Sequence, residues 1–230
     1  MKKTFTIAGM MLMIGAFLPG TASAQLYEMN YNSGGVIKQG TFYNGGYYAY
    51  VNGTRKGMWV GMINLKIRDV TAGSNWEALP TYCIQPDQYL RLPNTYHVDE
   101  LSNVVADATS IKKLWAAKYW STMPTIDEPD TSLKAAAFQT MVWEFTKDGT
   151  FDLNSGDFRL DLNNQNTARV ATLASQWYAD MANWSDQASL AALVSPNSQN
   201  QLRALPVPGG PLLSMVGLGS GIFFHRRRRA

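Results

Sequence analysis

Cysteine is almost absent from this chain of 230 residues, which contains only Cys83. A single cysteine excludes a disulfide within the chain, so its thiol is intermolecular, reactive or protected in some other way. Histidine is nearly as scarce, with only His97 and His225. Two histidines so far apart in the sequence provide too few ligands for a metal site. We therefore expect no metal and no cofactor.

Basic residues are also few in the body of the chain. The formal net charge is +3, but Lys2, Lys3 and Arg226–Arg229 lie at the two ends. The rest of the chain carries 14 basic and 17 acidic residues. Nothing in this balance indicates a nucleic-acid partner.

The first 24 residues have the pattern of a secretory signal peptide. Lys2 and Lys3 precede an apolar run, Phe5–Leu18, and Ala22-Ser23-Ala24 has the small residues of a cleavage site. The apolar run is short for a membrane span, although a retained anchor is the alternative. We expect a secreted protein whose mature chain begins at Gln25.

The last 25 residues, 206–230, form a separate module. Pro206–Pro211 is rich in proline and glycine, Leu212–Phe224 is apolar, and Arg226–Arg229 closes the chain. This order resembles the PEP-CTERM type of sorting signal, with Val-Pro-Gly-Gly in place of the usual Pro-Glu-Pro. The resemblance implies Gram-negative bacteria, an inner-membrane stage and processing by an exosortase-like transpeptidase. Thirteen helical residues span about 20 Å, less than the roughly 30 Å of a hydrocarbon core. The alternative is a permanent, weak anchor.

Residues 25–205 remain as one domain with a sizeable core, or two small ones. Residues 25–84 are β-rich, with strands predicted at Tyr47–Val51 and Gly57–Val70 and a hairpin turn at Asn52-Gly53. The following residues contain three helical patterns and a closing strand. The fold class is thus α+β, a β-sandwich or barrel-like sheet with a packed helical part. The remaining predicted elements are helices at Leu101–Trp120, Leu133–Phe145 and Asn166–Trp184, a further helical turn or two at Ser189–Val194, an irregular segment or short strand at Phe151–Leu162, and a strand at Asn197–Leu205.

The predicted helix Leu133–Phe145 organises this domain. Asp130 or Thr131 can cap its first turn, and Gly149 can end it. The helix is apolar except for the carboxamide of Gln139, which must find a partner if it is buried. The simplest interpretation is a core glutamine that is hydrogen-bonded to backbone.

Two short motifs resemble those of bacterial surface thioester domains. Tyr82-Cys83-Ile84 has a cysteine after an aromatic residue, and 137–144, AFQTMVWE, is close to the Gln-x-Ala-Ile-Trp pattern of that family. Met141 stands where the family usually has alanine, and Gln85 lies near a position where many members carry aspartate. The resemblance implies a bond between the Cys83 sulfur and the side-chain carbonyl carbon of Gln139.

Such a bond stores an electrophile. A primary amine on a target would attack the Gln139 carbonyl carbon, form an amide and release the Cys83 thiol. The reaction occurs once per molecule, so we expect a covalent adhesin or binding protein at the cell surface or in the extracellular matrix, and no turnover enzyme. Its partner would be an amine-bearing surface protein or polymer. The aromatic side chains of Tyr82, Phe138 and Trp143 would line the site and exclude water.

Two other functions remain open. In the first, the protein is a non-covalent structural component of an extracellular matrix or exopolysaccharide, and Cys83 is a simple buried thiol. In the second, it is a hydrolase or a transglutaminase-like enzyme with a Cys83 nucleophile, for which His97 is the only histidine in the folded part. We interpret Tyr82 and Glu144, the nearest titratable neighbours of the two motifs, as structural.

Overall fold

The computed structural model describes residues 25–32, 46–123 and 130–205. Helices and strands are mixed and the strands pair antiparallel, which confirms the α+β expectation. The predicted signal peptide, 1–24, and the C-terminal segment, 206–230, lie outside the described residues. Within the described part of the chain, no helix is both long enough and apolar enough to cross a membrane.

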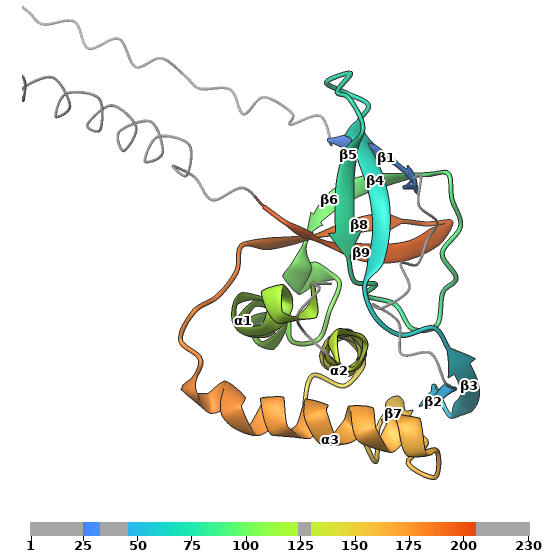
Figure 1. Cartoon of the computed structure of the whole chain (residues 1–230). Helices are drawn as coiled ribbons and strands as arrows, with labels where there is room; N and C mark the ends of the chain where they lie inside the picture. Colours follow the sequence, from blue (N-terminus) through green and yellow to red (C-terminus); the bar gives the residue numbers. More distant parts are fainter. Residues whose placement is uncertain (1–24, 33–45, 124–129, 206–230) are drawn as a thin grey trace, which may run out of the picture.

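A six-stranded antiparallel sheet forms one side of the domain (Figure 1). Two of its strands, β1 and β4, alternate buried and more exposed side chains; in β4, Ile63, Leu65 and Ile67 are buried. The spatial order is β5-β4-β1-β6-β8-β9. The strands are β1 (Leu26–Tyr31), β4 (Ile63–Asp69), β5 (Glu77–Thr81), β6 (Asn94–Glu100), β8 (Leu190–Ser195) and β9 (Ser198–Ala204).

The sheet curls until its two edges meet. The chain just after β5 pairs with β9: the Leu202 N–H donates to the Tyr82 carbonyl at 2.9 Å, and the Ile84 N–H donates to the Asn200 carbonyl at 2.9 Å. Between them, Cys83 forms an antiparallel bridge with Gln201. This closure protects both edge strands and fixes the backbone of Cys83.

A second, three-stranded sheet has the order β3-β2-β7, formed by β2 (Tyr47–Val51), β3 (Thr54–Met58) and β7 (Phe158–Leu160). Asn52 and Gly53 connect β2 to β3 with φ values of 49° and 76°. Two successive positive φ values are those of a type I′ hairpin turn, as the Asn-Gly pair predicts. The inward face of β2 consists of Tyr47, Ala49 and Val51, all buried.

Helix α2 (Thr131–Lys147) lies between the six-stranded sheet and helix α3 (Gln165–Asp180), with α1 (Ala108–Lys118) beside it (Figure 1). It is buried on nearly every side, which explains why its sequence has no polar face. Short 3₁₀ helices occur at Leu101–Asn103, Tyr119–Thr122 and Met181–Asn183. Gly149, with a φ of 67°, follows the end of α2 as predicted.

Some of the predicted elements were wrong. Ser189–Val194 is no helical turn, because Leu190–Ser195 is strand β8. Gly57–Val70 is not one strand, because Gly61 has a φ of 129° and separates β3 from β4. Only residues 108–118 of the predicted helix Leu101–Trp120 form an α-helix.

The predicted cap of α2 was partly wrong as well. Asp130 occupies the N-cap position, but its side chain accepts no hydrogen bond from the first turn. Its φ of 74° turns the carboxylate away from the usual capping geometry.

Candidate functional site

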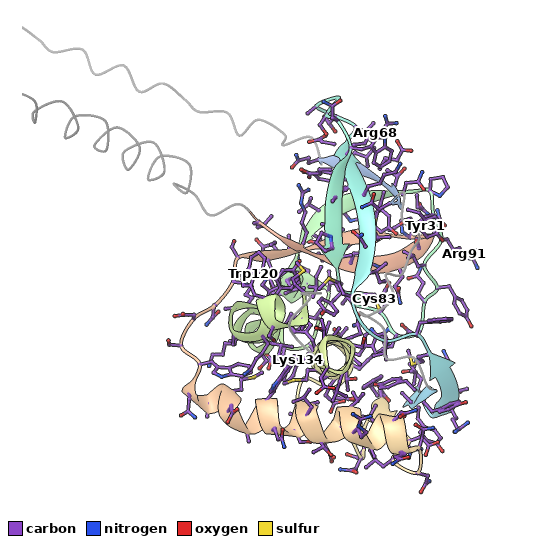
Figure 2. All side chains as sticks on the ribbon, viewed as in Figure 1. Tyr31, Arg68, Cys83, Arg91, Trp120 and Lys134 are labelled. Carbon is purple, nitrogen blue, oxygen red and sulfur yellow. The ribbon has the colours of Figure 1, made fainter. Side chains whose placement is uncertain are left out.

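Cys83 and Gln139 are 56 positions apart in sequence and meet where the closed sheet contacts α2. Cys83 is held from one side by β9, and Gln139 lies in the middle of α2. Figure 2 shows Cys83 at the end of the sheet that faces this helix. Both residues are buried, with 4% of Cys83 and none of Gln139 exposed.

The carboxamide of Gln139 makes its hydrogen bonds to a single residue, Cys83. Its Oε1 accepts the Cys83 N–H at 3.0 Å and lies 3.4 Å from the Cys83 sulfur, which donates its S–H to the same oxygen. Its Nε2 donates to the Cys83 carbonyl at 2.7 Å. Each polar atom of the amide therefore has a partner, and its carbonyl group is held against the thiol.

This geometry favours attack of the sulfur on the amide carbon. The Cys83 N–H already donates to Oε1, the atom on which negative charge develops when a nucleophile adds to the carbonyl. A backbone donor that is fixed in this way needs no rearrangement during the reaction. Holding thiol and amide in contact also raises their effective concentration, which helps an otherwise slow reaction.

Burial keeps the Cys83 sulfur neutral. Desolvation raises the pKa of the thiol to about 12, while the neighbouring Trp143 indole N–H acts in the opposite direction. That N–H has no hydrogen-bond acceptor of good geometry among the described residues. The site therefore favours a thiol or an acylated sulfur over a thiolate, and it keeps one unused donor beside the sulfur.

We expect alkylation of Cys83 to report this raised pKa. In a Gln139→Asn variant, whose amide is too short to reach the sulfur, the folded chain should react with iodoacetamide about tenfold faster for each pH unit between 7 and 10. Below a pKa of about 12 the reactive thiolate fraction rises in this proportion. The chain unfolded in urea is the control, and its rate should level off near the ordinary thiol pKa. A folded chain that also levels off there would contradict the prediction.

A pocket of about 510 Å³ lies over the sulfur. Cys83 and Trp143 contribute to its lining, and the aromatic residues Trp59 and Tyr89 line it with 72% and 80% of their surfaces exposed. A ligand can therefore approach Cys83 along aromatic walls from solvent. The pocket's other lining residues are Tyr31, Lys56, Gly57, Met58, Gly61, Ile63, Pro86, Asp87, Gln88, Leu90 and Gln199.

Of the three aromatic residues expected to line the site, Tyr82, Phe138 and Trp143, only Trp143 lines this pocket. Tyr82 and Phe138 have no exposed surface, and their ring centroids lie 4.3 Å apart in a cluster with Trp115 and Tyr119. This cluster covers the side of the Cys83–Gln139 pair that faces α1. Tyr82 and Phe138 thus exclude water from the site and do not contact a ligand in the pocket.

His97 lies apart from the thiol. It follows the buried Tyr96 in β6, so its side chain points to the opposite face of the strand, and it does not line the pocket. Gln85 is also turned away, because its Oε1 accepts the Asn200 N–H at 3.0 Å. In the described ranges, no group of three His, Cys, Asp or Glu residues is placed to hold a metal ion.

The pocket contains residues that the motifs did not predict. Lys56 comes from β3, Trp59 from the segment after it, Tyr89 from the loop after Cys83, and Gln199 from β9. The sequence gives no signal for Lys56 or Gln199, and for the other two residues only the presence of a large aromatic side chain, Trp59 or Tyr89. Their convergence depends on tertiary structure.

Comparison of the chain with protein-family models, curated proteins and solved structures finds no match. The function of the chain must therefore be inferred from its sequence motifs and from the geometry of this site.

Proposed function

We propose that this protein is a secreted, surface-anchored covalent binder that carries an internal thioester between Cys83 and Gln139. One observation carries the proposal: the N–H and S–H of Cys83 both contact Oε1 of Gln139, beneath a pocket open to solvent. A core glutamine needs only backbone partners, and a buried thiol needs no amide carbonyl beside it. The arrangement of both groups under a pocket supports a reactive pair.

Thioester formation would proceed in two steps. The Cys83 sulfur adds to the Gln139 side-chain carbon, and the Cys83 N–H stabilises the charge that develops on Oε1. The C–N bond then breaks, and ammonia leaves with the thiol proton. The hydrogen bond from Nε2 to the Cys83 carbonyl is lost with it, while the bond to Oε1 remains.

In the transfer to a target, an amine would be the nucleophile and the Cys83 sulfur would be the leaving group. A primary amine from the pocket adds to the same carbon, the C–S bond breaks, and the amine's proton passes to the sulfur. The Trp143 N–H has no other acceptor of good geometry in the described part of the chain, and it faces the sulfur that must take up negative charge. The product is an amide between Gln139 and the target, formed once per molecule without turnover.

The two ends of the chain support a location at the surface. Residues 1–24 would direct secretion, and 206–230 would hold the chain in the inner membrane until an exosortase-like transpeptidase acts on it. The domain would then reach the cell surface or the extracellular matrix, where its partner is an amine-bearing protein or polymer.

We expect the wild-type chain to be lighter than its sequence by one ammonia, and a Cys83→Ala variant to show no such deficit. Both full chains are purified without amine buffers, denatured in acid and measured by intact mass spectrometry. Any processing of the ends affects the two chains equally. When the folded chains are instead incubated with methylamine before this measurement, the mass of the wild type alone should increase by one methylamine. A tryptic peptide should then locate the methylamine on Gln139.

The competing interpretation is a non-covalent matrix protein with a buried free thiol, since both polar atoms of the Gln139 amide have hydrogen-bond partners without a covalent bond. Equal mass deviations in the two freshly prepared chains, with one titratable thiol in the wild type, would establish that interpretation and exclude the thioester.

A further inference from the structure

Lys56 has an unusual position for a lysine. It lies directly opposite Ala49 in the β2–β3 pair, and residues directly opposite in an antiparallel pair have side chains on the same face. Ala49 has no exposed surface and belongs to the face of β2 that packs into the core. Lys56 therefore points inward and is partly buried. Its neighbour Arg55 points outward, where it pairs with Asp161.

The ammonium group of Lys56 has no counter-charge among the described residues. It lines the same pocket as Cys83 and Trp143, and no other lysine among the described residues does so. The carboxylate in that lining, Asp87, is already bound to the Nζ of Lys147 at 2.7 Å. A primary amine thus lines the same pocket of about 510 Å³ as the Cys83 sulfur, which contacts the buried Gln139 amide, and no described counter-charge holds this amine elsewhere.

We propose that Lys56 is an internal acceptor for the thioester, an inference that rests on the function proposed above. The ammonium group of Lys56 first loses one proton to water. Its neutral Nζ adds to the Gln139 carbonyl carbon, the C–S bond breaks, and a second proton from Nζ passes to the Cys83 sulfur. The product is an isopeptide bond between Lys56 and Gln139 with a free Cys83 thiol. Ammonia has already left during thioester formation, so this step releases no further group.

This reaction would limit the lifetime of the electrophile. A target amine in the pocket competes with Lys56. A molecule that meets no target forms the internal bond between Lys56 and Gln139. The cross-link joins β3 to α2 and leaves a domain that can no longer react with an amine. An intramolecular nucleophile in the same pocket has a large effective concentration, so slow attack by Lys56 can compete with hydrolysis.

Mass and thiol content together distinguish the three states. The thioester lacks one ammonia and has no thiol, the isopeptide lacks one ammonia and has one thiol, and the hydrolysed chain has one thiol and has regained the mass of a water. The full chain is incubated at neutral pH without added amine, and samples are denatured in acid, titrated for thiol and weighed. In the wild type we expect the thiol to appear while the ammonia deficit persists, and tryptic peptides containing Lys56 and Gln139 to be joined.

Lys56→Arg keeps the positive charge but removes the nucleophile, and should lengthen the life of the thioester at least about tenfold. Lys66→Arg is the matched control, a partly buried lysine on β4 outside the pocket, and should behave like the wild type. If thiol appears in wild type and Lys56→Arg at one rate, and only with the gain of a water, Lys56 is not an acceptor although the thioester exists. If neither chain ever lacks ammonia, the proposed function fails and this inference fails with it.

Discussion

Removal of the Gln139 side chain will lower the free energy of unfolding by about 4 kcal/mol, measured in a Cys83→Ala background in which no thioester can form. Gln139 pairs both the N–H and the C=O of residue 83, and both are backbone groups that stay in place when the thiol is absent. An unpaired buried polar group costs about 1–3 kcal/mol, and Gln139→Ala would leave two. Urea unfolding followed by tryptophan fluorescence measures the difference.

Gln201 provides the matched control for this experiment. It is also a glutamine without exposed surface, but its Nε2 makes one hydrogen bond, to the Gln199 carbonyl, and its Oε1 has no partner in the described part of the chain. Gln201→Ala in the same background should cost less than half as much as Gln139→Ala. Equal losses would mean that the pairing of residue 83 contributes nothing beyond the burial of an amide.

The stability of the chain should fall as the pH rises from about 5 to 8, and Glu144→Gln should remove this fall. Glu144 has no exposed surface, and burial raises the pKa of its carboxyl from 4.5 to about 8, with Asp148 and Asp152 adding to the effect. The folded chain therefore keeps a proton that the unfolded chain releases in this window, so unfolding becomes easier as the pH increases. Each unit of pKa shift corresponds to about 1.4 kcal/mol.

The substitution retains the main contact of this side chain, because Oε1 of Glu144 accepts the Asp152 N–H at 2.6 Å and an amide oxygen can do the same. We expect the variant to be a few kcal/mol more stable than its parent at pH 8 and similar to it at pH 5. Glu100→Gln, at an exposed position, is the control and should leave the pH dependence unchanged. The interpretation is wrong if the wild-type stability is flat between pH 5 and 8.

Helix α2 and the contact between Gln139 and Cys83 were predictable for different reasons. Helix α2 has a continuous apolar sequence and ends before Gly149, so local signals define it well. The contact between Cys83 and Gln139 has no local signal, and it was expected only because the two motifs resemble those of a known family. The Asn52-Gly53 turn followed from the residues alone, since few other pairs adopt two positive φ values.

The errors occur where tertiary pairing decides the structure. The apolar run of Leu190–Ser195 is buried on both faces of the strand, so its sequence has no alternation to distinguish it from a helical turn. The pocket could not be predicted either, because its walls come from β1, β3, β4, β9, α2 and two loops, which are distant in sequence. The inward position of Lys56 depends on its register opposite Ala49, which the sequence alone does not define.

The bridge between Cys83 and Gln201 also determines when the site can exist. A chain is synthesised from its N-terminus, and Cys83 and Gln139 are complete well before β9 emerges. Until residues 198–204 pair with 81–84, the sheet is not closed, and the backbone of Cys83 has, among the described residues, only its two hydrogen bonds to Gln139 to hold it against α2. The complete enclosure of the Cys83–Gln139 pair therefore depends on the last strand of the domain.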